Sequence, residues 1–149
     1  QSKNKTKKNV IMRFEKQTDL QREQKAIKLF TERFNGGFIK LGENDVDFRI
    51  LAKDGTVIGY AEVKGRNKTM ADAFPLPVAA RKIVKLMDKS KKVEPVIIWA
   101  CLDGIIYGKI KELGGVLKVG GRKPREHAAN DIEAMVYYYE TADLKKIKY

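Results

Sequence analysis

The sequence of 149 residues, 43% of them hydrophobic, has the size and apolar content of one domain with a single packed core. Its 31 Lys and Arg against 19 Asp and Glu give a formal charge of +12, which favours a polyanionic partner, with nucleic acid ahead of an anionic membrane surface. No apolar run is long enough to span a membrane or to act as a secretory signal, so we expect a soluble, unexported protein that does not enter membranes.

A basic segment and a helix are predicted first. Residues 1–16 carry six Lys or Arg and predict a basic N-terminal arm, which either contacts DNA or is a solvated tail. Residues 17–149 are predicted to form a single domain. Apolar positions at spacings of three and four predict a helix from Thr18 to Phe34. Asn35-Gly36-Gly37 supplies the residues that tolerate positive φ and ends this helix.

Three strands are predicted next, over Phe38–Leu41, Val46–Ala52 and Val57–Val63. The sequence Lys53-Asp54-Gly55-Thr56 has the composition of a hairpin turn between the last two of them. The second and third strands are therefore expected to lie side by side and antiparallel.

The second half of the chain predicts a helix followed by strands. Prolines 75 and 77 bracket the expected start of a helix over Val78–Lys89. The apolar run Val96–Leu102 predicts a strand buried on both faces, in which the lone Cys101 is a core residue and not a nucleophile. A turn then leads to Ile105–Tyr107, and a last strand is expected around Ile132–Tyr139. This order predicts an α/β fold with a mixed central sheet flanked by helices.

Two acids and a lysine gather on the expected hairpin. Alternation along a strand places Glu62 and Lys64 on one face, and the hairpin can bring Asp47 beside them. Such charges are costly to bury unless they are paired or bind a metal. The two carboxylates, with the carbonyl oxygen of Val63, are ligands of the kind that Mg²⁺ prefers, and the lysine could position the attacking water. Asp45 and Glu43 compete with Asp47, which we prefer because it is expected inside the strand.

These residues resemble the PD-(D/E)XK nuclease superfamily, in which Asp47 stands for the first acid and Glu62-Val63-Lys64 for the E-x-K element. Within it, Leu20 to Lys64 looks most like the archaeal Holliday junction resolvases and related phage nucleases, although Val46 replaces the usual proline. The resemblance implies a restriction-endonuclease-like core, a Mg²⁺ or Mn²⁺ cofactor, and Glu23 as a third acid on the first helix.

The helical pattern bears on Glu23. Leu20, Ile27 and Phe34 define an apolar stripe, and the stacking of Leu20, Glu23 and Ile27 turns the carboxylate toward the sheet. A charge placed there needs a compensating cation. That cation is a metal ion in the resolvase-like interpretation, and a nearby Lys or Arg in the alternative.

Basic residues outside this motif are candidates for DNA binding. Substrate contact is favoured for those that directly follow the motif, whereas the helix and loop groups could equally be solvated surface. The candidates lie after the motif, on the second helix and in a glycine-flanked loop, and are Arg66, Lys68, Arg81, Lys82, Lys85, Arg122, Lys123 and Arg125.

The predicted function is hydrolysis of DNA phosphodiester bonds by a metal-dependent endonuclease in the cytoplasm of a bacterial, archaeal or phage-infected cell. The candidates are a junction resolvase, a structure-selective flap or nicking enzyme, and a sequence-specific restriction-like enzyme. The small size favours recognition of DNA structure, and two-strand cleavage would favour a homodimer. The alternative is a non-catalytic nucleic-acid-binding module on the same fold.

Overall fold

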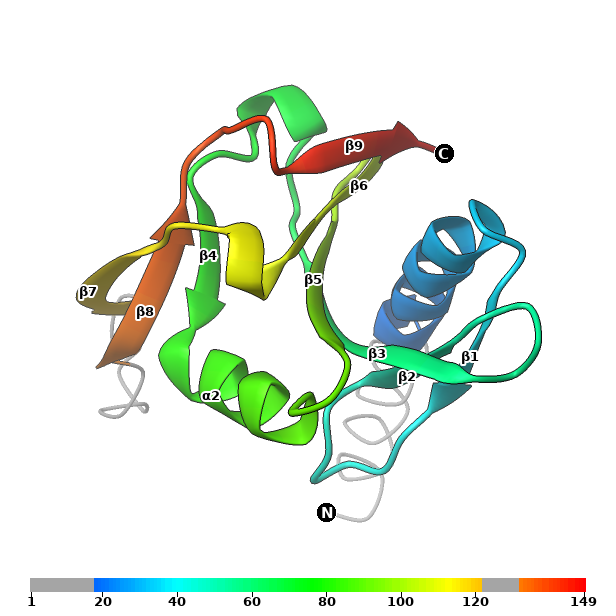
Figure 1. Ribbon diagram of the computed structural model, residues 1–149. Helices are drawn as coiled ribbons and strands as arrows, with labels where there is room; N and C mark the ends of the chain where they lie inside the picture. The colour runs from blue at the N-terminus through cyan, green and yellow to red at the C-terminus, as the bar shows by residue number, and fades with distance from the viewer. Residues whose placement is uncertain (1–17, 122–131) are drawn as a thin grey trace, which may run out of the picture.

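The computed structural model describes residues 18–121 and 132–149. They form two α-helices and two sheets, and the second helix contacts both sheets (Figure 1). The first helix covers residues 18–32 and is called the N-terminal helix below. The other elements are β1 (Gly37–Lys40), β2 (Phe48–Leu51), β3 (Val57–Gly65), η1 (Met70–Asp72), β4 (Leu76–Ala79), α2 (Ala80–Lys89), β5 (Glu94–Ala100), β6 (Gly104–Lys109), η2 (Ile110–Glu112), β7 (Val116–Gly121), β8 (Ile132–Tyr138) and β9 (Lys145–Lys148). In the described part of the chain, neither helix is long and apolar enough to cross a membrane.

The larger sheet has six strands in the order β1-β2-β3-β5-β6-β9. Strands β3 and β5 are parallel, and every other neighbouring pair in this sheet is antiparallel. The smaller sheet is antiparallel, with the order β4-β8-β7. The α/β fold with a mixed sheet is therefore confirmed, and it is compatible with a restriction-endonuclease-like core.

Two hydrophobic cores lie on opposite faces of the larger sheet, and β5 contributes to both. Val96, Ile98 and Ala100 pack under the N-terminal helix. Ile97 and Trp99 point the other way, into the core that α2 and the smaller sheet cover. Figure 1 shows β5 passing between these two layers. The prediction of a strand buried on both faces is confirmed, but the strand ends at Ala100, and Leu102 is 61% exposed. Cys101, just after the strand, is a buried free cysteine.

The predicted start of the second helix is wrong. Val78 belongs to β4, where it pairs with Val136 of β8, and α2 begins only at Ala80. Pro77 is extended because it too pairs in β4, and its carbonyl oxygen accepts a hydrogen bond of 2.9 Å from the Trp99 indole. Prolines near a helix start are also compatible with an edge strand, and β4 is such a strand.

The apolar stripe expected on the N-terminal helix is only partly correct. Ala26, Ile27 and Phe30 are buried against the sheet, whereas Leu20 is 44% exposed and Phe34 is 36% exposed. Phe34 does not continue the helical face because the helix ends at residue 32. Asn35, with φ of 55°, takes the left-handed conformation that ends it.

The hairpin that carries the motif forms as predicted, but its first strand is shorter. Strand β2 begins at Phe48, so Asp47 lies at a bend just before the strand and not inside it. The bend sends Val46 into the core under α2 and Phe48 into the core under the N-terminal helix. The turn to β3 includes Gly55 with φ of 87°, a conformation that favours glycine.

Candidate active site

Glu62 and Lys64 lie on the face of β3 that is turned toward α2. Their neighbours Ala61 and Val63 point to the opposite face and pack under the N-terminal helix. Glu62 is only 5% exposed, while Lys64 is half-buried. Alternation along one strand thus delivers a buried carboxylate and a more accessible ammonium group to the same side of the sheet.

A cavity of about 420 Å³ opens where β3 and β5 end, and we call it the site cavity. Its lining includes Lys64 and Gly65 from β3, Lys82 from α2, and Arg22 and Glu23 from the N-terminal helix. The carboxyl ends of adjacent parallel strands are a common location for ligand sites in α/β sheets. Residues of both helices line the cavity at this end of the two strands.

Asp47 is fixed to the strand that carries Glu62. Its Oδ2 accepts a hydrogen bond of 2.8 Å from the backbone N–H of Val63. The competing acid Asp45 turns away, because its Oδ2 lies 3.0 Å from Lys89 Nζ and its Oδ1 accepts the N–H of Val46. The geometry therefore brings Asp47, and not Asp45, to the E-x-K segment.

The environment of Glu62 disfavours its negative charge. Burial is the main reason that its pKa rises to about 8, and the charge and hydrogen bonding of Asp47 raise it further. Lys82 Nζ, 3.9 Å from Glu62 Oε2, and the more distant Lys85 lower the pKa only in part. Near neutral pH the protonated form of Glu62 is therefore favoured, and a bound cation would stabilise its negative charge.

The side chain of Lys40 lies between Glu23 and Asp47. Lys40 Nζ on β1 lies 3.4 Å from Glu23 Oε2 and 4.0 Å from Asp47 Oδ1. The pKa of Glu23 is raised, first by burial and then by the charge of Asp47, while Lys40 opposes the rise. Glu23 therefore faces the hairpin. Its ion-pair partner is Lys40, a basic residue of the kind that the alternative interpretation expected.

The donor chemistry suits a hard divalent cation. The oxygens of Asp47 and Glu62 are ligands that Mg²⁺ and Mn²⁺ accept. An extended residue directs its N–H and C=O toward the same side, so the carbonyl oxygen of Val63 faces the side of Asp47. Within the described residues, however, no three Asp, Glu, His or Cys side chains are close enough together to hold a metal. The two carboxylates fit the ion, and Glu23 stands apart from them.

Lys40 and Arg22 are site residues that the sequence analysis missed. Lys40 pairs with Phe48 across β1 and β2, which places it one residue from Asp47. This neighbour could have been found by extending the expected hairpin to the preceding strand. Arg22 reaches the cavity from a different element, and no local pattern indicates it.

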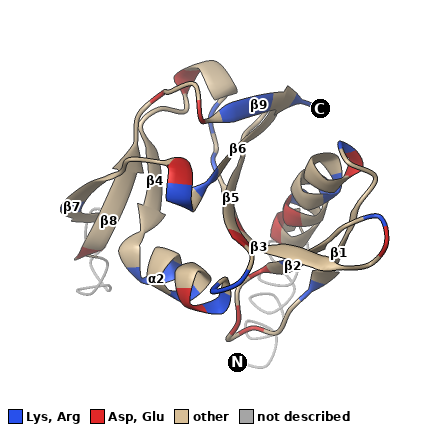
Figure 2. Ribbon diagram, viewed as in Figure 1, with Lys and Arg blue, Asp and Glu red and all other residues tan. Residues whose placement is uncertain are grey.

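The expected DNA-binding residues have different environments in the structure. Lys82 lines the site cavity, and Lys85 is exposed on the same helix, where Figure 2 shows several basic positions. Arg81 is engaged with Glu133 at 2.9 Å. Arg66 donates from its Nε to the carbonyl oxygen of Ala73, at 3.0 Å, so its guanidinium is held by the backbone.

The remaining candidates are exposed or lie outside the described residues. Lys68 is exposed after the motif. The basic arm of residues 1–16 and the loop residues Arg122, Lys123 and Arg125 are not among those that the structure describes.

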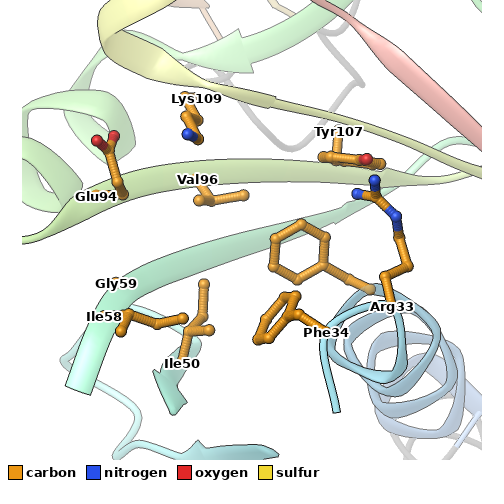
Figure 3. Close-up of a pocket in the computed structure, with 10 residues that line it drawn as sticks. Arg33, Phe34, Ile50, Ile58, Gly59, Glu94, Val96, Tyr107 and Lys109 are labelled. Carbon is orange, nitrogen blue, oxygen red and sulfur yellow. The ribbon is translucent and has the colours of Figure 1, made fainter. Parts of the chain in front are cut away.

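A second hollow, of about 300 Å³, lies at the start of β3 and β5 (Figure 3). Its wall is mostly apolar, with Phe34 and Ile50 on one side and the Arg33 guanidinium 4.9 Å from the centre of the Tyr107 ring. None of the expected acids or Lys64 lines it. Of the expected site residues, Glu23, Val63 and Lys64 line the site cavity at the opposite ends of these strands, whereas Asp47 and Glu62 line neither space.

The model of the family described as "Phage putative PDDEXK endonuclease" matches residues 10–147 of the chain. This range contains Glu23, Asp47 and the segment Glu62-Val63-Lys64. No curated protein and no solved structure matches the chain.

Proposed function

Because this chain belongs to the phage PD-(D/E)XK endonuclease family, we propose that it cleaves DNA by metal-dependent hydrolysis at Asp47, Glu62 and Lys64. The observation that carries the proposal is the carboxyl pair. Glu62 is 5% exposed beside a second acid, and the charge of that acid raises its pKa. A purely structural role would not explain why two acids lie side by side where burial and the charge of Asp47 both disfavour the negative charge of Glu62.

Each residue has a distinct task in this proposal. Asp47 and Glu62, with the carbonyl oxygen of Val63, would hold the cation. A bound divalent cation would supply positive charge at the scissile phosphate and acidify a water. Lys64, on the same face as Glu62, would orient the attacking water and offset the charge that develops on the phosphate. Glu23 would support the site from the helix.

Recognition of DNA structure is the finer part of the proposal. The charge of +12 supports binding to phosphates irrespective of base sequence. Cleavage of both strands would need two such sites, so we propose a homodimer for that activity. We expect the enzyme to act in the cytoplasm of an infected cell, since the matching family is a phage family.

A non-catalytic DNA-binding module is the second candidate. It is favoured by one observation, the absence of a three-ligand metal cluster among the described residues. Such a protein would bind DNA equally well with and without a divalent cation, and it would leave every substrate intact.

A substrate panel separates the two functions. Duplex, single-stranded, tailed and four-way junction DNA are incubated with Mg²⁺, Mn²⁺ or EDTA, and products are resolved on denaturing gels. The proposal predicts cleavage of at least one branched or tailed substrate with metal and none with EDTA. Intact substrates under all conditions, with binding retained, would establish the binding module instead.

A further inference from the structure

A third hollow adjoins the site cavity, and we call it the Tyr149 hollow. It measures about 360 Å³, and its lining includes Gln21, Lys25, Arg66, Asn67 and Tyr149. It shares Arg22 and Ala100 with the site cavity. The guanidinium of Arg22 therefore stands at the boundary between the two spaces.

The guanidinium of Arg22 lies close to Gly65, the residue directly after Lys64. A Cβ atom at position 65 would come within 2.7 Å of Arg22 Nη1. On its other side, Arg22 Nη2 lies 3.2 Å from Asp19 Oδ1. One basic group is thus placed where a DNA strand leaving the site cavity would enter the neighbouring hollow.

The charge of the Tyr149 hollow differs from that of the site cavity. The described residues that line it supply Arg22, Lys25 and Arg66 but no Asp or Glu. Asp19 and Glu23, by contrast, both line the site cavity. The cations that line the hollow suit it to a phosphate group.

Its other side chains are of the types that recognise a base. Tyr149 is 42% exposed, and Lys25 Nζ lies 3.9 Å from the centre of its ring. Gln21 and Asn67 carry amides, which can both donate to and accept from the edge of a base. Aromatic rings, amides and cations together are the usual means of binding unpaired nucleotides.

The hollow is built on fixed backbone. Arg66 N–H donates to the carbonyl oxygen of Ala100 at 2.8 Å, and Tyr149 N–H donates to that of Asp103 at 3.2 Å. Cys101 also lines the space, and burial, with the nearby Asp103 charge, raises the pKa of its thiol to about 11. The thiol is therefore neutral and serves as part of the lining.

We propose that the Tyr149 hollow binds one unpaired nucleotide of a DNA strand whose scissile phosphate occupies the site cavity. Arg22 and Lys25 contact its phosphate, and Tyr149 and Asn67 contact its base. This inference rests on the proposed function and gives it a basis for structure selectivity, because a blunt duplex has no unpaired nucleotide to offer.

The test is a binding experiment in EDTA, which needs no cleavage. Fluorescence anisotropy compares a blunt duplex with the same duplex carrying a short single-stranded tail, and with one whose tail lacks bases. Wild-type protein should bind the tailed DNA at least about fivefold more tightly than the blunt DNA, given the usual contribution of base stacking. The abasic tail should lose most of this preference.

Variants of the lining residues test whether the Tyr149 hollow causes the preference for tailed DNA. Tyr149→Ala and Asn67→Ala should each reduce the preference for the tail while leaving blunt-duplex affinity within about twofold, whereas Tyr149→Phe should retain it. Tyr139→Ala is the matched control, since Tyr139 is exposed and lines neither space. Equal binding of blunt and tailed DNA by the wild type, or an unchanged preference in Tyr149→Ala, would overturn the inference.

The failure of this inference and the failure of the proposed function can be told apart. A tail preference that depends on Tyr149, in a protein that never cleaves, would support the hollow and reject the nuclease. Metal-dependent cleavage without any tail preference would support the nuclease and reject the role of the hollow.

Discussion

The backbone N–H of Val63 donates a hydrogen bond of 2.8 Å to Asp47 Oδ2, and this bond joins two segments sixteen residues apart. It fixes the first acid beside the strand that carries Glu62 and Lys64. The two carboxyls are therefore positioned by one hydrogen-bonded hairpin. Lys64 belongs to the same unit, and its role can be tested against a nearby lysine.

Lys64→Ala should reduce the cleavage rate by about 10²- to 10⁴-fold, because it removes a group that orients water and offsets charge in the transition state. Lys53→Ala is the control, since Lys53 is exposed in the turn of the same hairpin. Single-turnover kinetics on the best substrate of the panel measure both. A loss below about threefold for Lys64→Ala would leave it without a catalytic role.

Metal affinity should depend on pH through Glu62. Its pKa of about 8 lies above the ordinary value of 4.5, so cation binding must displace a proton below pH 8. The apparent affinity for Mg²⁺ should rise by up to about tenfold per pH unit between pH 6 and 8 and then level off. Calorimetry at several pH values measures this rise. A flat profile for the wild type would contradict it, and Glu62→Gln should show little dependence.

The same shift affects the stability of the metal-free protein. Because the folded pKa is raised, the protonated Glu62 stabilises the fold fully below pH 4.5, and this contribution is lost as pH rises through about 8. Thermal melts in EDTA should show a decline toward alkaline pH that Glu62→Gln reduces. A decline of equal size in the variant would assign it to other groups.

Glu23 and Lys40 should have opposite effects on metal binding. Glu23→Gln keeps the shape and removes a negative charge, so it should raise the Mg²⁺ concentration needed for cleavage and spare folding. Lys40→Met removes the ammonium that lies between Glu23 and Asp47, and it should lower that concentration by up to about fivefold. A Mg²⁺ titration of activity, with calorimetry as a second measurement, compares them. Wild-type behaviour of Glu23→Gln would make Glu23 structural.

The DNA-binding face should include α2. Neutralising Lys82 and Lys85 with glutamine should weaken DNA binding and reduce the slope of log affinity against log salt by about one for each phosphate that the variant no longer neutralises. The same change at Lys145 and Lys146 should have less effect, because both lie on the edge strand β9. Equal effects at the two places would mean that only net charge matters.

The sequence predicts the parts of the site that depend on local order. Period-two alternation places Glu62 and Lys64 on one face, and the turn at Gly55 returns the chain so that Asp47 can meet them. These relationships lie within one hairpin. The fold class follows in the same way, from the order of helical and extended segments.

What could not be predicted depends on contacts between distant elements. Lys82 on α2 and Arg22 on the N-terminal helix line one cavity only because both helices pack against the sheet near the ends of β3 and β5. Strands β7 and β9 were missed because β7 is exposed and glycine-flanked and β9 is mostly lysine, so neither carries a buried apolar pattern. The helix signal at Pro77 was misleading because pairing with β8 holds that segment extended.

The most direct test of the central claim is cleavage by the variants Asp47→Ala and Glu62→Ala. In single-turnover assays with Mg²⁺, both should lose detectable cleavage while binding DNA as tightly as the wild type or more tightly, because each removes a metal ligand and a negative charge from a basic surface. Circular dichroism confirms that they fold. Cleavage at the wild-type rate by either folded variant would contradict the assignment of the active site.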